Sequence, residues 1–185
     1  CFIMKKYLSI LFLILLINSV SAGTRENIIQ NLKDTNNISF KFEQNINGKI
    51  ENGNCVIEYP KKIFCNYKLS NQKILVSNGK TLVIKTITSY YLYPLEKTPL
   101  NFILDKNYLI KKIKNSNERY VADKFINYTF VEENNELNIF FNKDDYNLVG
   151  WQTLDIYQNL NITYLSSVIK DQNLEKNLFT LPDQN

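Results

Sequence analysis

Residues Gly53–Lys85 have the sequence GNCVIEYPKKIFCNYKLSNQKILVSNGKTLVIK, and this stretch decides the fold. Apolar and polar residues alternate on both sides of Pro60, and Asn78-Gly79 is a strong hairpin signal, so we predict four short strands joined by tight turns. The apolar residues fall largely on one face of this predicted sheet. The remaining sequence offers too few large apolar side chains to cover that face fully, which is the first clue to function.

Working outward, the sequence predicts further strands and a few short helices in a single α+β domain. The alternation in Ile38–Ile46 indicates a strand, and Thr98-Pro99 is typical of a helix start. The expected helices are Arg25–Lys33, Pro99–Leu104 and a turn at Tyr108–Lys112, with chain turns at Gly48 and Asn52-Gly53. The expected outer strands are Ile38–Ile46, Tyr90–Tyr93, Phe125–Val131, Glu136–Phe141, Leu148–Tyr157 and Leu160–Ile169, giving nine or ten antiparallel strands in all.

The N-terminus has the pattern of a cleaved secretion signal. Lys5 and Lys6 precede the apolar run Tyr7–Ile17, and Val20-Ser21-Ala22 supplies the small residues of a cleavage site. The apolar run is shorter than the roughly 20 residues that a membrane-spanning helix needs. We therefore expect residues 1–22 to be a signal peptide and residues 23–185 to form an exported, periplasmic domain.

Composition excludes several classes of function. The formal net charge of +4 is small, and no basic stripe interleaved with aromatic residues suggests nucleic-acid binding. The chain contains no histidine, which removes histidine-dependent catalysis and histidine-ligated metals. Paired carboxylates remain a formal catalytic option, but Glu132-Glu133 and Asp144-Asp145 lie in turn-like polar stretches where solvated charges are expected. We expect no enzyme activity, no cofactor, no metal and a monomeric protein.

Cys55 and Cys65 are equidistant from Pro60, so a hairpin turning there places them opposite each other. Opposed residues in an antiparallel pair have Cβ atoms about 4.5–5.5 Å apart, near disulfide range. An oxidising compartment favours the bond. The alternative is a pair of small buried thiols, and in either case the role is structural.

The apolar face fits two arrangements, and periodicity does not decide between them. Two sheets could cover each other, or one long sheet could curl around its own apolar face with the short helices as a lid. In the second case the inward residues would form a deep apolar cavity. The candidate lining and lid residues are Phe40, Phe42, Ile57, Tyr59, Ile63, Tyr67, Leu82, Ile84, Tyr91, Leu100, Ile103, Leu104, Ile162 and Tyr164.

The order and spacing of several motifs resemble the outer-membrane lipoprotein carrier family, the LolA-type periplasmic chaperones. The resemblance covers nearly the whole domain that follows the signal. The motifs are Ile38–Gln44, Gly53 with Tyr59-Pro60, Ile74–Leu82, Thr98-Pro99-Leu100, Leu148–Trp151 and Leu178-Phe179. This resemblance implies an unclosed β-barrel, a half-barrel, with a helical lid over a hydrophobic cavity that shields lipoprotein acyl chains.

The same resemblance implies partners. These are acylated lipoproteins, an inner-membrane ABC-type release complex, and an outer-membrane receptor or the outer membrane itself. In one position the chain departs from the family, which commonly has Arg-Pro where this sequence has Tyr59-Pro60. That arginine is associated with holding the lid closed. A tyrosine lacks its cationic fork, so either the latch differs here or the chain is a divergent carrier with other cargo.

Two other functions stay open at this point. One is a half-barrel protein that binds or senses free lipid or glycolipid. The other is an acid-catalysed hydrolase, which needs two carboxyl groups within about 10 Å of each other in a cleft.

Overall fold

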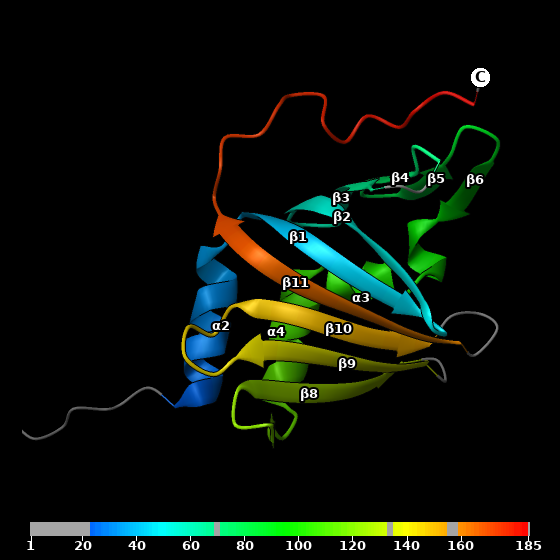
Figure 1. Cartoon of the computed structure of the whole chain (residues 1–185). Coiled ribbons are helices and arrows are strands. Elements are labelled where there is room, and N and C mark those ends of the chain that lie inside the picture. The colour runs from blue at the N-terminus through cyan, green and yellow to red at the C-terminus, as the bar shows by residue number, and fades with distance from the viewer. Residues whose placement is uncertain (1–22, 69–70, 133–134, 155–158, 185) are drawn as a thin grey trace, which may run out of the picture.

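The computed structural model describes residues 23–68, 71–132, 135–154 and 159–184. The expected signal peptide, residues 1–22, lies outside these ranges. Eleven strands form one antiparallel sheet in the order β6-β5-β4-β3-β2-β1-β11-β10-β9-β8-β7. The two outermost strands are not paired with each other, so the sheet curls without closing (Figure 1). The predicted α+β half-barrel is therefore confirmed, and the two-sheet alternative is wrong.

The elements follow one another along the chain with short connections. The helices are α2 (Thr24–Asp34), the 3-10 helix η1 (Leu95–Lys97), α3 (Leu100–Ile103) and α4 (Lys106–Lys114). The strands are β1 (Asn37–Ile46), β2 (Lys49–Glu58), β3 (Lys62–Tyr67), β4 (Ile74–Asn78), β5 (Thr81–Lys85), β6 (Tyr90–Pro94), β7 (Arg119–Val121), β8 (Phe125–Glu132), β9 (Asn135–Asn142), β10 (Leu148–Leu154) and β11 (Leu160–Lys170).

The stretch that decides the fold forms strands β2 to β5 as predicted. Cys55 pairs with Cys65 across β2 and β3, and Val76 pairs with Val83 across β4 and β5. A disulfide joins Cys55 to Cys65, with their Cα atoms 4.1 Å apart. The hairpin therefore has the register that symmetric spacing about Pro60 predicts.

The expected turn at Asn52-Gly53 is wrong, because both residues lie inside β2. Only Asn47 and Gly48, both with positive φ, reverse the chain before this strand. Gly53 is needed in the strand because the backbone of β3 and the ring of Phe42 lie very close to its Cα. A Cβ there would lie 2.1 Å from the backbone oxygen of Asn66 and 2.8 Å from the Phe42 ring. The glycine thus makes room for an aromatic ring on the inner face and does not make a turn.

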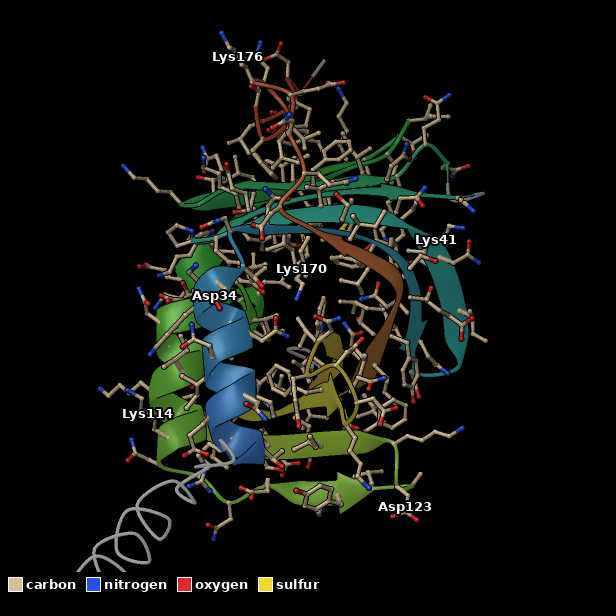
Figure 2. The ribbon with its side chains drawn as sticks, turned by 90° about the vertical axis from the view of Figure 1, so that its left-hand side faces the viewer. Asp34, Lys41, Lys114, Asp123, Lys170 and Lys176 are labelled. Carbon is tan, nitrogen blue, oxygen red and sulfur yellow. A yellow bond between two sulfur atoms is a disulfide. The ribbon has the colours of Figure 1, made fainter. Side chains whose placement is uncertain are left out.

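Helices α2 and α4 lie side by side along the open side of the curled sheet (Figure 2). Their buried residues are Ile28, Ile29 and Leu32 of α2, and Leu109, Ile110 and Ile113 of α4. These residues join one buried cluster with the inner faces of β8 and β9, including the fully buried Tyr128 and Phe141. The two helices therefore cover the inner face of β8 and β9.

Two details of the second half of the chain differ from expectation. The three-residue strand β7 raises the strand count above the expected nine or ten, because an edge strand this short has no readable alternation. Strand β11 contains an irregularity at Ser167, whose φ is 52° and where the register with β1 shifts. Before this bulge the odd-numbered residues, such as Thr163, face inward, whereas after it the even-numbered Val168 does.

The C-terminal segment, residues 172–184, crosses the outer face of the β3–β6 half (Figure 1). Lys85 Nζ donates to the backbone oxygen of Asp183 at 2.7 Å, and the Tyr90 hydroxyl donates to that of Pro182 at 3.2 Å. The Lys62 ammonium lies 5.7 Å from the ring centre of Phe179. Beneath this segment Val76 and Val83 are almost fully buried on the outer face. Within the described part of the chain, none of the helices has the length and apolarity needed to span a bilayer.

Candidate ligand cavity

A cavity of about 230 Å³ lies between the inner face of the sheet and helix α3. It occupies the half of the sheet that α2 and α4 do not fill. Most of its lining is apolar, and a smaller polar group is present. The apolar lining is Phe42, Ile46, Cys55, Ile63, Cys65, Leu75, Leu82, Ile84, Pro99, Leu100, Ile103, Trp151 and Leu154, and the polar lining is Gln44, Tyr67, Lys73, Thr98, Thr153, Asn161 and Thr163.

The structure brings seven of the sequence-predicted residues to the cavity wall: Phe42, Ile63, Tyr67, Leu82, Ile84, Leu100 and Ile103. Three others are buried in the apolar core away from the cavity, namely Phe40, Ile57 and Leu104. The Phe40 ring packs edge-on against Trp151, with ring centres 6.4 Å apart. Tyr59 is partly buried and packs against the same core.

The expected inward orientation of Ile162 and Tyr164 is wrong. Thr163 lines the cavity, so its two neighbours in β11 point to the outer face, and Tyr164 is 54% exposed. Tyr91 pairs with Ile84 and so shares the inner side of the sheet, but it lies in the edge strand beyond the cavity and is 52% exposed. The prediction had placed Ile162 and Tyr164 on the same face of the strand as Val168, and the bulge at Ser167 separates them from it.

The turn between β2 and β3 is tied to the segment that joins α3 to α4. The Lys61 backbone N–H donates to the Leu104 oxygen at 2.8 Å, and the Lys61 ammonium lies 3.7 Å from the Asp105 carboxylate. Asp105 also caps α4 by accepting from the backbone N–H groups of Asn107 and Tyr108. Lys61, next to the Tyr59-Pro60 pair, therefore supplies a cationic contact to the lid.

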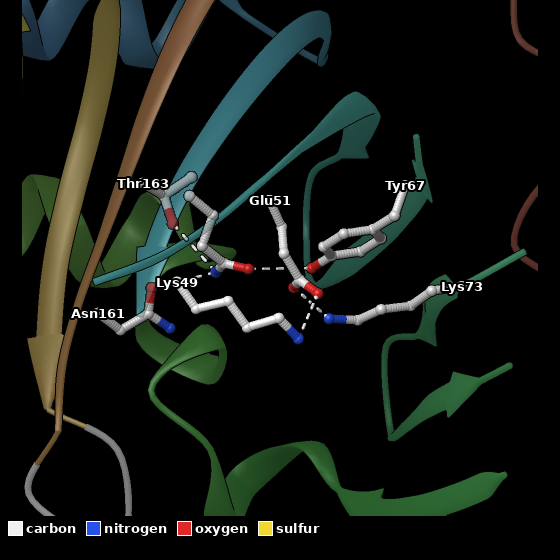
Figure 3. Close-up of polar contacts among 7 residues, drawn as sticks. Lys49, Glu51, Tyr67, Lys73, Asn161 and Thr163 are labelled. Carbon is white, nitrogen blue, oxygen red and sulfur yellow. Dashed lines mark hydrogen bonds and ion pairs between the residues drawn. The ribbon is translucent and has the colours of Figure 1, made fainter. Parts of the chain in front are cut away.

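A row of polar side chains crosses one end of the cavity (Figure 3). Gln44 Nε2 donates to Asn161 Oδ1 at 3.1 Å and to Thr163 Oγ1 at 3.3 Å. The Tyr67 hydroxyl donates to Gln44 Oε1 at 3.3 Å. Through Gln44, side chains of β1, β3 and β11 are thus joined across the inner face.

The row continues into an ion pair. Lys73 Nζ donates to Glu51 Oε2 at 2.5 Å and lies 4.1 Å from the centre of the Tyr67 ring. The Lys49 ammonium lies 3.2 Å from Glu51 Oε1. Exposed fractions are 5% for the Glu51 side chain, 18% for Lys73 and 76% for Lys49. The close pair is therefore Glu51 with Lys73, and Lys49 is a solvent-exposed addition.

Burial and charge act in opposite directions on the groups of this row. Burial raises the pKa of the Glu51 carboxyl, but hydrogen bonds and attraction from Lys73 and Lys49 outweigh it, and the net pKa is lowered. Burial also raises the pKa of the Tyr67 hydroxyl, and the nearby Glu51 charge adds to this. At neutral pH the Glu51 side chain is thus a carboxylate and the Tyr67 side chain a neutral phenol.

Sequence reasoning missed this polar row because it assigned polar residues to the outer face. One signal was available. Continuing the alternation of β1 from Phe40 and Phe42 puts Gln44 on the same inner face. Gln44 pairs with Glu51 on one side and with Thr163 on the other, so the register alone assembles the row. Lys73 precedes β4 and carries no comparable signal.

The acidic residues considered for catalysis lie elsewhere. Glu132 is bonded to Lys112, and Asp144 and Asp145 are exposed in the turn before β10. Glu133 lies outside the described residues. Within the ranges that the structure describes, no three His, Cys, Asp or Glu side chains come together as a metal site would require.

Comparison with known proteins gives a family and a fold. The family described as outer membrane lipoprotein carrier protein LolA matches residues 33–182. No curated protein matches the chain.

Solved structures of similar fold have very low sequence identity to this chain. An uncharacterised conserved protein from Thermus thermophilus is 7% identical, with a TM-score of 0.53, over 88% of this chain and 96% of that one. A LolA superfamily protein from Nitrosomonas europaea is 7% identical, with a TM-score of 0.45, over 86% of this chain and 99% of that one. A putative outer membrane lipoprotein-sorting protein domain from Vibrio parahaemolyticus is 8% identical, with a TM-score of 0.44, over 83% and 94%.

The family match spans most of the chain, and the half-barrel with its helical cover agrees with it. This chain belongs to the family of the outer membrane lipoprotein carrier protein LolA.

Proposed function

We propose that this protein is a non-enzymatic periplasmic carrier that shields the acyl chains of lipoproteins on their way from the inner to the outer membrane. The supporting observation is the apolar cavity between the sheet and α3 in a chain of the LolA family. An inner-membrane ABC-type release complex would supply the cargo. A receptor in the outer membrane, or that membrane itself, would accept it.

A carrier must offset the free-energy cost of exposing an acyl chain to water. Each buried CH₂ contributes about 0.8 kcal/mol, so an acyl chain of ~16 carbons faces roughly 10 kcal/mol against entering water. A carrier must offset most of this cost and still release the chain. The cavity of about 230 Å³ is smaller than the usual ligand pockets of about 300–1,000 Å³. The cavity must therefore enlarge to hold an acyl chain, and movement of the lid would provide the room.

Helix α3 is the element suited to move. It has four residues, and of these Leu100, Asn101 and Phe102 are only partly buried while Ile103 is fully buried. In contrast α2 and α4 each bury three large apolar residues. Displacing α3 exchanges its contacts with the sheet for contacts with cargo, which keeps the binding free energy small enough for release.

The described residues of the cavity wall include no aspartate or glutamate. This supports a binding role over hydrolysis by a carboxylate pair, which would need two acidic groups within the cleft.

The proposal is tested by what the protein carries and by whether the cavity binds an apolar probe. Protein purified from its native periplasm should yield acylated polypeptide in mass spectrometry; free phospholipid alone would instead indicate a lipid-binding relative. In titrations, N-phenyl-1-naphthylamine should bind the purified domain with increased fluorescence.

A matched pair of variants locates the binding. Ile84→Trp fills the cavity wall and should abolish probe binding, whereas Ile87→Trp adds the same ring at a position that is 66% exposed and should leave it unchanged. Equal probe binding by both variants would contradict the proposed site.

A further inference from the structure

The polar row marks one end of an otherwise apolar cavity. Its members are Gln44, Glu51, Tyr67, Lys73, Asn161 and Thr163. Gln44 follows Phe42 on the inner face of β1, and Glu51 precedes Gly53 and Cys55 on that of β2. The inner face thus changes from apolar to polar at the same level in neighbouring strands. A ligand in this cavity meets hydrocarbon at one end and hydrogen-bonding groups at the other.

Hydrogen bonds and ion pairs hold these groups in place. Lys73 has three N–H donors and uses one of them for Glu51, and its other contact is with the face of Tyr67. Lys73, Thr163 and Asn161 all line the cavity, whereas Glu51 lies behind Lys73 and does not. The carboxylate therefore fixes an ammonium group whose remaining donors are available to the cavity.

The buried part of the row is electrically neutral. Glu51 and Lys73 are both largely buried and oppositely charged, while Lys49 is 76% exposed and screened by water. A second carboxylate or a phosphate brought beside Lys73 would lie close to Glu51, where repulsion is strong because the surroundings are poor in water. A neutral acceptor meets no such repulsion and can take a hydrogen bond from Lys73.

We propose that this polar end is a head-group subsite that selects acyl chains linked through neutral ester or amide carbonyls over free anionic lipids. The inference rests on the proposed function, since it needs a cavity that accepts acyl chains. It adds a basis for specificity. Lys73 and Thr163 would donate hydrogen bonds to the carbonyl oxygens, and Glu51 would act as a positioning residue that also repels anions.

The test compares ligands that have the same hydrocarbon chain length and differ in their head groups. Monolauroylglycerol, laurate and dodecyl phosphate are used to displace bound N-phenyl-1-naphthylamine at about pH 7.4, below their critical micelle concentrations. The parent protein should bind the neutral ester about tenfold more tightly than either anion. Laurate and dodecyl phosphate separate a carboxylate from a phosphate as the source of any anion binding.

Removing the carboxylate should abolish this preference. In Glu51→Gln the Lys73 ammonium loses its anionic partner, so laurate and dodecyl phosphate should gain about tenfold while the ester changes less than about threefold. The matched control is Glu43→Gln, which removes the same charge from an exposed position on the outer side of β1. It should leave all three affinities unchanged.

A second variant covers the case in which Glu51→Gln does not fold. Thr163→Val removes one hydroxyl from the cavity wall with little change in shape and should weaken only the ester, by about threefold to tenfold. Probe binding by the parent protein separates the two proposals. A parent protein that does not bind the probe refutes the carrier function. Probe binding without a preference for the ester, or with a preference that Glu51→Gln leaves intact, refutes the head-group subsite alone.

Discussion

At the scale of single residues, Lys61 joins the β2–β3 turn to the lid. Its backbone N–H bonds to Leu104 and its ammonium lies 3.7 Å from Asp105. The ion pair is partly exposed, and such pairs contribute about 0.2–1 kcal/mol. This range suits a latch that has to open during each transfer.

Lys61→Met keeps the backbone bond and removes the ion pair. We expect less than about 1 kcal/mol of lost stability and probe association about two- to fivefold faster, because the lid opens more easily. Stopped-flow fluorescence with N-phenyl-1-naphthylamine measures the rate.

The matched control for this latch is Lys62→Met. Lys62 pairs with Glu58 at 2.7 Å on the outer face, away from the lid, so its loss should leave the rate unchanged. Equal association rates for the parent and both variants would mean that the Lys61–Asp105 contact does not restrain the lid.

Gly53→Ala tests the close approach within β2. The added Cβ would lie 2.1 Å from a backbone oxygen of β3, which cannot retreat without disturbing the β2–β3 pairing. We expect about 3 kcal/mol of lost stability in urea unfolding, at the upper end for overpacking. Asn54→Ala, one residue along the strand at an exposed position, should change stability by no more than about 0.5 kcal/mol. A Gly53→Ala variant as stable as Asn54→Ala would show that β2 and β3 tolerate the extra methyl group.

At the scale of elements, the Cys55–Cys65 disulfide closes a hairpin within the central part of the sheet. A loop of this length gives about 2–3 kcal/mol in the chain-entropy account. The double variant Cys55→Ala/Cys65→Ala should therefore lose about 2–3 kcal/mol of unfolding free energy and unfold at a lower urea concentration. Measurement in dithiothreitol provides the comparison, since the reduced parent should approach the variant. An unchanged midpoint in the oxidised state would contradict a stabilising role.

The same scale explains how far the sequence predicts this molecule. Strands β3 to β5 and the second half of β2 follow from alternation and turn residues, because they are short and flanked by clear signals. The first half of β2 was missed, because Asn52-Gly53 was interpreted as a turn. In strand β11 alternation predicts the wrong face for some residues. The bulge at Ser167 lets Val168 pack against the core while Tyr164 points outward. A single strained residue reverses the alternation, and no composition rule detects it.

The candidate site was predictable in its apolar part and in Tyr67. Phe42, Ile63, Leu82 and Ile84 lie on the cavity wall because apolar side chains of this sheet face inward. Gln44 and Thr163 lie there too, because register and not hydrophobicity decides which side of a strand a residue occupies. Strand order comes from long-range pairing, which local sequence does not encode.

At the scale of the whole molecule, the C-terminal segment covers an apolar part of the outer face. A chain shortened to residue 173 keeps Asp171 and Gln172, which bond to Asn36 and Asn37, and uncovers Val76 and Val83. Full burial of a valine contributes about 1.5–3 kcal/mol, so we expect about 3 kcal/mol or more of lost stability. Thermal unfolding and binding of an apolar dye to the outer face measure the effect.

The control for this truncation removes only residues 184–185, beyond the contacts of Pro182 and Asp183 with the sheet. It should behave as the full chain does. If the longer truncation also keeps the full melting temperature, the segment does not contribute to covering the sheet.

The two unpaired margins of the sheet, β6 and β7, have a mechanical consequence. In a closed barrel the girth is fixed by strand number and stagger, so swelling requires the rupture of inter-strand bonds. Here the circumference is interrupted, and the wall can flatten or tighten while every ladder remains intact. The interior can therefore grow to the girth of its contents by flexing alone, with the helices that bridge the gap setting how far it opens.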